Sequence, residues 1–501
     1  MSEEKKQAIN LTTKIVQGGA WVFGRMLFTN VINIVVMAIL ARQLTPAEFG
    51  LAAVANIILR LFNILTSQGS NQYVIYDNKE GREERAGAAF WLDFALALCC
   101  TFIGILLIPA VVNFYKLPEL KYILLVLFLK YPIDAISKVP DAMIRKDLEF
   151  KKLEIRDTIL EVLSGILSVI FVFTGFGVWS LIVPGMITSP IRALIVFSIS
   201  KWKPGFNFHF NFWPKIFKFS SNVIGGTLTS FVLAEGDSMI IGRILGAHAL
   251  GIYNLSWQSA NIVGRTIVTL SNKLTFPALS KVAADPEKLK ESIGRVLKLL
   301  SITTFPLLIG LFVVADDFIL TIYGSQWKDS ILPLRILIVF ALRYTAGSPM
   351  GMVFIVLGRP DINFKAGLAI VPVYLASIIF GCKFGVIGVA IAVTVVRSLN
   401  GIIYFYIASR LLKESFWKLV SPMNASLTAS LIMGVSLVLL KLLLGFEAGG
   451  VSLALFTVVG GMIYWLLLRG PYNQLSQELV NLSDTLLGHK NRLARRILNV
   501  A

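Results

Sequence analysis

Residues 333–357 read PLRILIVFALRYTAGSPMGMVFIVL, an apolar run with one cation, Arg343, near its middle. A run of this length can cross the hydrocarbon layer of a membrane as a helix, which takes about 20 residues. A charged side chain at the bilayer centre costs roughly 3 kcal/mol or more. We therefore expect the Arg343 guanidinium to face protein or a water-filled cavity and not lipid.

The same pattern recurs along the chain. We interpret fourteen apolar segments as membrane spans, and every even-numbered one from the second to the twelfth carries a cation near its middle. Because open strands cannot satisfy their backbone hydrogen bonds in lipid, the spans are expected to be helices. The sequence thus predicts an all-α polytopic membrane protein of about 14 transmembrane helices. The spans are 15–41, 49–67, 88–113, 121–142, 155–174, 179–200, 217–242, 250–272, 295–320, 333–357, 364–382, 386–409, 420–444 and 449–468. The central cations are Arg60, Lys130, Arg192, Arg265, Arg343 and Arg397.

Composition agrees with a membrane protein and excludes several other classes. The 501 residues are 56% hydrophobic and 15% charged, with a mean hydropathy of +0.74. The net charge of +18 comes from cations in short connections and not from a separate basic domain, which argues against nucleic-acid binding. The three cysteines and three histidines are scattered, so neither a disulfide framework nor a metal site is expected.

The distribution of Lys and Arg predicts the orientation. Most of the cations between spans fall on one side, together with both ends of the chain. The positive-inside rule places this side in the cytoplasm. We expect residues 1–14 to form a cytoplasmic N-terminus. The tail 469–501 has leucines at helical spacing and several arginines, which suits either an amphipathic helix on the anionic inner surface or a solvated tail.

An internal repeat indicates duplication. The segments ARQLTPAEFG (41–50) and GRILGAHALG (242–251) share Arg, Leu and Gly at an offset of 201, and FGV recurs at 176–178 and 384–386. Parallel repeats of this kind are common in transporters. The predicted organisation is a six-helix bundle at 15–200, a cytoplasmic linker at 201–216, a second six-helix bundle at 217–409, and two additional helices at 420–468.

The central cations are the candidate substrate-binding residues. Guanidinium groups bind phosphate through a two-pronged fork, so a cavity lined by arginines suits a large anionic substrate. Lys130 has Asp134 one turn further on, and a local ion pair is an equally good interpretation for it. The other five need partners from other helices or a bound anion. Arg25, in the first span, is expected to guard the cytoplasmic mouth or to reach toward lipid headgroups.

Two acids in the seventh span, Glu235 and Asp237, are candidates for coupling transport to an H⁺ or Na⁺ gradient, because the first span has Ile34 and Val36 at the equivalent positions. The alternative is an ion pair with one of the arginines. The sequence has no Walker-type glycine loop, nucleophile elbow or helical pair of metal-binding histidines. We therefore expect no catalytic residue, no cofactor and no enzyme activity.

Several short stretches resemble the polysaccharide-unit flippases of the Wzx type, within the multidrug/oligosaccharidyl-lipid/polysaccharide exporter superfamily. Their order and spacing carry the resemblance, which extends from the first span to the tenth and is closest to the branch that exports colanic-acid-like exopolysaccharide units. The stretches are ARQL (41–44) with EFG (48–50), FY (114–115) with Pro118, GFGVWSL (175–181), GR (242–243) with Gly246, Gly251 and Tyr253, FPALS (276–280), and YG (323–324) with QW (326–327).

This resemblance implies a multi-pass protein of the bacterial inner membrane, built from two bundles around a central cationic cavity. Such proteins move an undecaprenyl-pyrophosphate-linked oligosaccharide from the cytoplasmic to the periplasmic leaflet by alternating access, for exopolysaccharide or lipopolysaccharide synthesis. Polysaccharide polymerase machinery is a possible partner.

Other functions remain open at this point. A lipid II flippase is hard to separate by charge alone, whereas a drug exporter is expected to line its cavity with acids. A membrane glycan polymerase or ligase is expected to have a large periplasmic loop, and the longest outer connection here has about a dozen residues.

Overall fold

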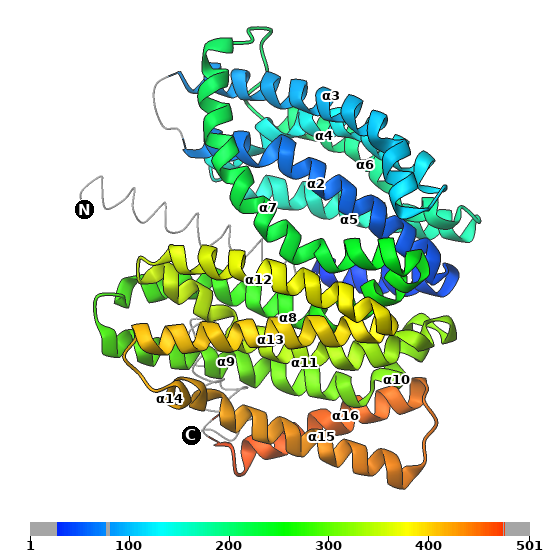
Figure 1. Cartoon of the computed structure of the whole chain (residues 1–501), viewed down its shortest axis with the longest axis vertical. Helices are drawn as coiled ribbons and strands as arrows, with labels where there is room; N and C mark the ends of the chain where they lie inside the picture. Colours follow the sequence, from blue (N-terminus) through cyan, green and yellow to red (C-terminus); the bar gives the residue numbers. More distant parts are fainter. Residues whose placement is uncertain (1–27, 77–80, 474, 476–501) are drawn as a thin grey trace. The chain divides into compact units, whose positions relative to one another are not determined.

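The computed structural model describes residues 28–76, 81–473 and 475, and all regular structure in these residues is helical (Figure 1). The chain divides into two compact units, Met1–Gly251 and Ile252–Ala501. In the first unit, the helix Phe28–Gln43 is followed by α2 (Pro46–Tyr76), α3 (Arg82–Tyr115), α4 (Leu120–Lys146), α5 (Phe150–Phe173), η1 (Gly177–Leu181), α6 (Val183–Ile199), η2 (Phe210–Phe212) and α7 (Trp213–Ile244). Helix α8 (Gly246–Val282) begins in the first unit and continues into the second.

The second unit contains the rest of α8 and the helices that follow it. Its elements are α9 (Pro286–Val313), α10 (Ala315–Phe318), η3 (Ile319–Tyr323), η4 (Ser325–Ser330), α11 (Ile331–Val356), α12 (Pro360–Gly381), η5 (Cys382–Phe384), α13 (Gly385–Leu411), α14 (Phe416–Val420), η6 (Ser421–Met423), α15 (Asn424–Leu444) and α16 (Gly450–Arg469). The all-α class that the sequence predicts is confirmed.

Each unit has its own apolar interior. In the first, α2 packs against α4 and α7, α3 packs against α4, and α6 packs against α4 and α5. Buried side chains such as Phe90, Met143 and Trp202 join α3, α4 and the segment after α6. In the second, α11 packs against α9 and α13, α12 against α13, and α9 against α15. A cluster that includes Phe354 and Phe405 fills its interior.

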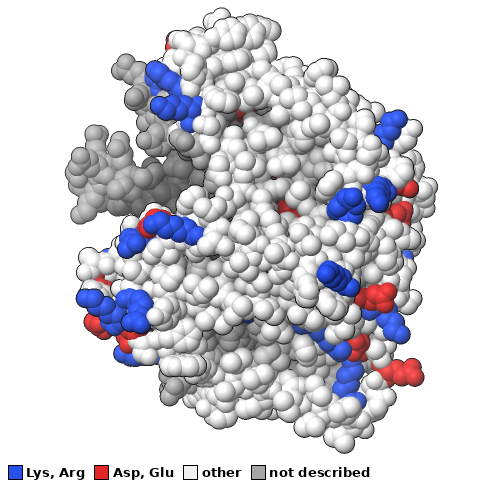
Figure 2. Space-filling model, viewed as in Figure 1, with Lys and Arg blue, Asp and Glu red and all other residues white. Residues whose placement is uncertain are grey.

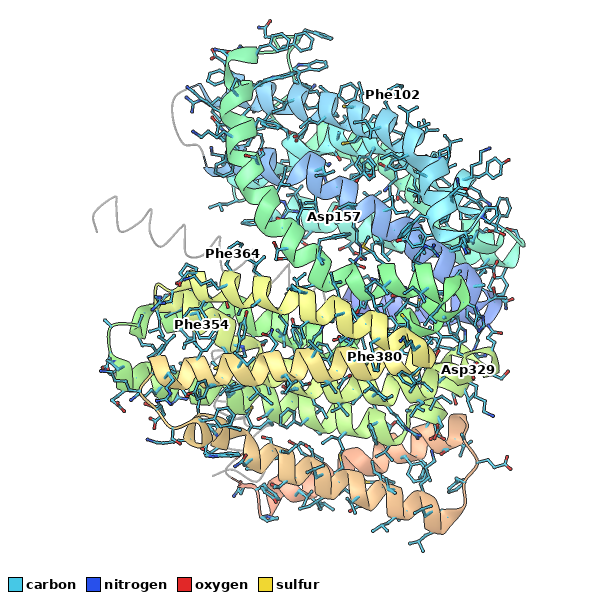
Figure 3. All side chains as sticks on the ribbon, in the orientation of Figure 1. Phe102, Asp157, Asp329, Phe354, Phe364 and Phe380 are labelled. Carbon is cyan, nitrogen blue, oxygen red and sulfur yellow. The ribbon has the colours of Figure 1, made fainter. Side chains whose placement is uncertain are left out.

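Many large apolar side chains point outward, as lipid-facing helices require. Phe102 on α3 is 66% exposed and Phe380 on α12 is 61% exposed, whereas Phe354 is fully buried (Figure 3). On the face seen in Figure 2, most charged side chains gather toward the ends of the helices, and the surface over the helix middles shows only small acidic areas. This distribution is typical of a protein whose helices cross a membrane.

Eight helical segments of the described residues are long and apolar enough to cross a membrane. Helices α4, α5, α7 and α8 are also long but are not in this set. For α4 the reason is visible in the sequence, because Lys130, Asp134 and Lys138 lie along its middle turns. The predicted number of fourteen spans therefore stays a prediction.

Local sequence signals set the helix ends. Asp285 precedes α9 and its carboxylate accepts a hydrogen bond from the Lys288 amide, while Pro286 occupies the first helical position, where no backbone donor is needed. The Lys288 ammonium, together with the same capping contact, lowers the pKa of the Asp285 carboxyl. Gly385 at φ 68° starts α13 and Gly445 at φ 60° ends α15, both in the region that favours glycine.

The two segments of the sequence repeat pack against each other within the first unit. A Cβ on Gly50 would overlap the carbonyl group of Ala247, and a Cβ on Gly251 would overlap the carbonyl group of Pro46. The repeat offset of 201 converts position 46 into 247 and position 50 into 251. The two contacts therefore exchange equivalent positions, as a local two-fold axis between the repeated segments would produce.

Replacing Gly50 by alanine is expected to destabilise the protein by about 1–3 kcal/mol, since the new methyl group meets rigid backbone and not a movable side chain. The measurement is the thermal unfolding temperature of the purified protein in detergent. Gly225→Ala on α7 is the control, because nothing lies within 4 Å of a Cβ at that position. Equal unfolding temperatures for the two variants would contradict the close crossing.

Candidate functional site

Two of the predicted cations of the first unit form ion pairs with a single carboxylate each. Arg60 on α2 pairs with Glu235 on α7, although the Arg60 side chain is 65% exposed. Lys130 lies 3.1 Å from Asp134 one turn along α4, and Asp134 also accepts a hydrogen bond from Ser189 on α6. The structure thus shows the local pair for Lys130, and for Glu235 the alternative of an ion pair with an arginine.

Arg192 on α6 belongs to a larger charged cluster with Asp157 and Arg156 of α5 and Asp141 of α4. Arg192 Nη1 lies 3.3 Å from Asp157 Oδ1. The same oxygen accepts hydrogen bonds from Arg156 Nε at 3.0 Å and Arg156 Nη2 at 2.8 Å. Both terminal nitrogens of Arg156 also donate to the two oxygens of Asp141. We call these four residues the α4–α6 charge cluster.

Arg397 on α13 lies among aromatic rings. Its guanidinium carbon is 4.7 Å from the ring centre of Tyr374, 5.1 Å from that of Trp257 and 5.6 Å from that of Phe340. Its Nη2 also donates to the Tyr374 hydroxyl at 2.6 Å. Such cation–π contacts hold a guanidinium in place without neutralising its charge.

Arg343 on α11 is held differently from the others. Its Nη1 donates to the backbone carbonyl of Ser398 on α13 at 3.3 Å, and its buried Nε has no hydrogen-bond partner among the described residues. Gly347 and Gly401 make room for the guanidinium: a Cβ on Gly347 would come within 3.3 Å of Nη2, and one on Gly401 would coincide with the group. In the part of the chain that the structure describes, no carboxylate lies within 4.0 Å of Arg343. This guanidinium therefore keeps an uncompensated positive charge.

The remaining predicted residues are less informative. Arg25 lies outside the described residues, and Arg265 lies on α8 with its side chain outside the described part. Asp237 on α7 is 1% exposed, and its carboxylate accepts a hydrogen bond from the amide of Ser238. Within the described ranges, no group of three or more His, Cys, Asp or Glu side chains is placed to hold a metal ion.

Sequence reasoning missed the role of Arg156. It lies at the start of the predicted fifth span, 155–174, and was not among the candidate site residues, but its side chain is only 1% exposed and it lies at the centre of the α4–α6 charge cluster. Figure 3 shows Asp157 among the helices of the first unit. The adjacent opposite charges at positions 156 and 157, at the entry to an apolar segment, were the available signal.

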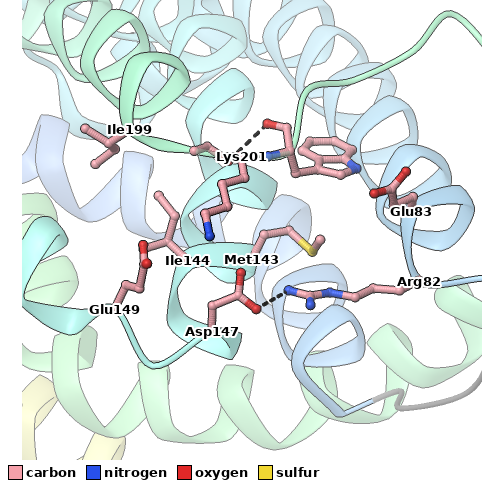
Figure 4. A pocket seen from close by; sticks show the side chains of 10 residues that line it. Arg82, Glu83, Met143, Ile144, Asp147, Glu149, Ile199 and Lys201 are labelled. Carbon is pink, nitrogen blue, oxygen red and sulfur yellow. Dashed lines mark hydrogen bonds and ion pairs between the residues drawn. The ribbon is translucent and has the colours of Figure 1, made fainter. Parts of the chain in front are cut away.

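A cavity of about 200 Å³ lies where α3 begins and α4 ends (Figure 4). An ion pair of 2.7 Å between Arg82 Nη2 and Asp147 Oδ1 lines it, and Lys201 points toward Asp147 and Glu149. Its lining contains both signs of charge and none of the predicted substrate-binding residues. This cavity therefore adds nothing to the candidate site.

The fold is similar to that of a solved transporter. The lipid II flippase MurJ in an inward closed conformation superposes with a TM-score of 0.72, covering 91% of this chain and 99% of that chain at 16% sequence identity. At this identity the likeness shows the fold and nothing about the substrate.

Curated relatives extend over most of the sequence. The lipopolysaccharide biosynthesis protein WzxC of Escherichia coli (strain K12) is 26% identical over 406 residues, which are 80% of this chain and 82% of that protein. The teichuronic acid biosynthesis protein TuaB of Bacillus subtilis (strain 168) is 24% identical over 479 residues, which are 94% of this chain and 98% of that protein. A family model described as polysaccharide biosynthesis protein matches residues 39–332, more than half of the sequence. The chain therefore belongs to the polysaccharide biosynthesis protein family.

Proposed function

We propose that this protein is a flippase of polysaccharide biosynthesis that moves an undecaprenyl-pyrophosphate-linked oligosaccharide repeat unit from the cytoplasmic to the periplasmic leaflet of a bacterial inner membrane. Family membership, the biosynthetic names of the relatives and the transporter fold support translocation and not catalysis. The pyrophosphate linkage rests on the arginines.

A glycan headgroup needs a protein path through the membrane. Its many hydroxyl groups would lose their hydrogen-bond partners in hydrocarbon, at a cost of several kcal/mol for each unsatisfied group. A path lined with polar and cationic groups replaces these partners while the prenyl chain stays in lipid. Alternating access then exposes the headgroup first to one side of the membrane and then to the other.

Arg343 is the observation that carries the proposal. A guanidinium in the middle of an apolar helix is unfavourable unless an anion compensates it, and the described residues place no carboxylate next to it. Its Ser398 contact uses only part of its donor capacity. A phosphate group supplies both the negative charge and several acceptor oxygens.

The other predicted cations fit the same substrate in different ways. Arg60, Lys130 and Arg192 have carboxylate partners that a substrate phosphate would have to displace. Arg397 is positioned by aromatic rings. Arg25 and Arg265 complete the set as proposals from the sequence alone.

Coupling, orientation and partners follow the same proposal. Coupling to an H⁺ or Na⁺ gradient through Glu235 and Asp237 supplies the energy, since the sequence has no nucleotide site. Both termini face the cytoplasm. The exported unit is then available to polysaccharide polymerase machinery.

The test is a flipping assay in proteoliposomes with a prenyl-pyrophosphate-linked acidic oligosaccharide. We expect wild type to translocate the lipid and Arg343→Gln to reduce the rate about tenfold, the effect of losing one charge-assisted contact. Arg335→Gln is the matched control, because Arg335 lies on the same helix and pairs with Asp316 at 2.7 Å. A folded wild type that moves nothing, with or without an ion gradient, would contradict the substrate class. Full activity of Arg343→Gln would contradict the role of Arg343.

A further inference from the structure

We infer that Asp157 is the resting counter-ion of Arg192, and that substrate phosphate displaces it during transport. This inference rests on the proposed function. It makes Arg192 the exchangeable cation of the first unit and Asp157 a positioning residue that competes with the substrate.

The exposure of the side chains in the α4–α6 charge cluster rises from Arg156 through Asp157 to Arg192. The side chain of Arg156 is 1% exposed and that of Asp157 is 9% exposed, whereas that of Arg192 is 39% exposed. An anion can therefore reach Arg192 while the inner members of the cluster stay covered. The exposed end of the cluster is the end at which exchange can occur.

The contacts within the cluster are unequal. Arg156 binds Asp157 through two nitrogens at 2.8 and 3.0 Å, and it binds Asp141 through its two terminal nitrogens. Arg192 reaches Asp157 through one nitrogen at 3.3 Å. When Arg192 turns away, Asp157 therefore keeps its shorter contacts to Arg156, and no carboxylate of the cluster is left without a cation.

The charge of Asp157 explains why the exchange is reversible. When Arg192 binds a phosphate, the Asp157 carboxylate stays in place through its contacts with Arg156 and attracts the Arg192 guanidinium back. Asp157 thus lowers the affinity for the anion and speeds its release, as a transporter requires on the exit side.

The experiment compares Asp157→Asn, Arg192→Gln and the double variant in the flipping assay, at a series of substrate concentrations. We expect Asp157→Asn to lower the half-saturating concentration about fivefold and to lower the maximal rate, because Arg192 then holds the anion longer. Arg192→Gln is expected to raise the half-saturating concentration about tenfold. In the double variant, Asp157→Asn is expected to leave the half-saturating concentration at the value of Arg192→Gln alone.

A binding measurement separates affinity from transport. Calorimetric titration of the purified full chain with inorganic pyrophosphate is expected to show the same order of affinities, with Asp157→Asn above wild type and Arg192→Gln below it. Asp316→Asn is the control, since it removes a carboxylate from an arginine pair in the second unit. Its affinity for pyrophosphate is expected to match that of wild type.

The outcomes are distinct. A wild type that neither binds pyrophosphate nor transports overturns the proposed function and this inference with it. Transport by wild type with an unchanged half-saturating concentration in folded Asp157→Asn overturns this inference alone. If Asp157→Asn does not fold, Asp157→Glu decides: it keeps the competing charge, so its half-saturating concentration is expected at or above the wild-type value, and a fall overturns the inference.

Discussion

Replacing Gly401 by alanine is expected to reduce transport at least as much as Arg343→Gln, about tenfold, although the residue carries no functional group. A Cβ at this position of α13 would coincide with the Arg343 guanidinium. The guanidinium would have to leave its contact with the Ser398 carbonyl, so the proposed phosphate-binding charge would be displaced. The overlap is also expected to cost about 1–3 kcal/mol of stability. The measurements are the flipping rate and the unfolding temperature.

A second substitution separates the steric effect from the loss of charge. In Gly401→Ala combined with Arg343→Ser, the shorter side chain leaves space for the new methyl group, so stability is expected to recover while transport does not. Gly461→Ala on α16 is the control, because nothing lies within 4 Å of a Cβ there. Transport by folded Gly401→Ala at the wild-type rate would show that the position of the Arg343 guanidinium is unimportant.

The sequence predicted the positions of the cations along their spans better than the residues that they contact. Hydropathy alone places Arg343 in the middle of a span, and the one-turn spacing of Lys130 and Asp134 predicts their pairing, because helix geometry brings these positions together. The pairing of Arg60 with Glu235 joins positions 175 residues apart and depends on how α2 packs against α7. A single sequence carries no direct signal for such a contact.

The two glycines next to Arg343 illustrate the same limit. Gly347 lies one turn after Arg343 and is its predictable neighbour, but Gly401 belongs to another helix. Arg156 was missed for a different reason: at the border between a connection and a span, a buried cation has the same sequence pattern as a loop cation of the positive-inside rule.

Replacing Arg156 by leucine is expected to have the largest effect on stability. The substitution leaves Asp141 and Asp157 near each other with Arg192, at 3.3 Å from Asp157, as the remaining cation of the cluster. Removing one partner from a buried ion pair costs about 3–5 kcal/mol. We expect a large fall in the unfolding temperature of the protein in detergent. Arg359→Leu is the control, because its ion pair with Asp361 is exposed and such pairs contribute about 0–1 kcal/mol.

A variant that removes the charges of Arg156, Asp141 and Asp157 together tests whether the cluster serves stability or transport. In Arg156→Leu combined with Asp141→Asn and Asp157→Asn, no buried carboxylate lacks a cation, and most of the stability is expected to return, since buried ion pairs often contribute little net stability. Transport is not expected to return with it, because Arg192 then has no competing counter-ion to release the anion. A triple variant that is both stable and fully active would show that the cluster serves neither stability nor transport. Recovery of stability alone would mean that the charges are retained for their effect on Arg192.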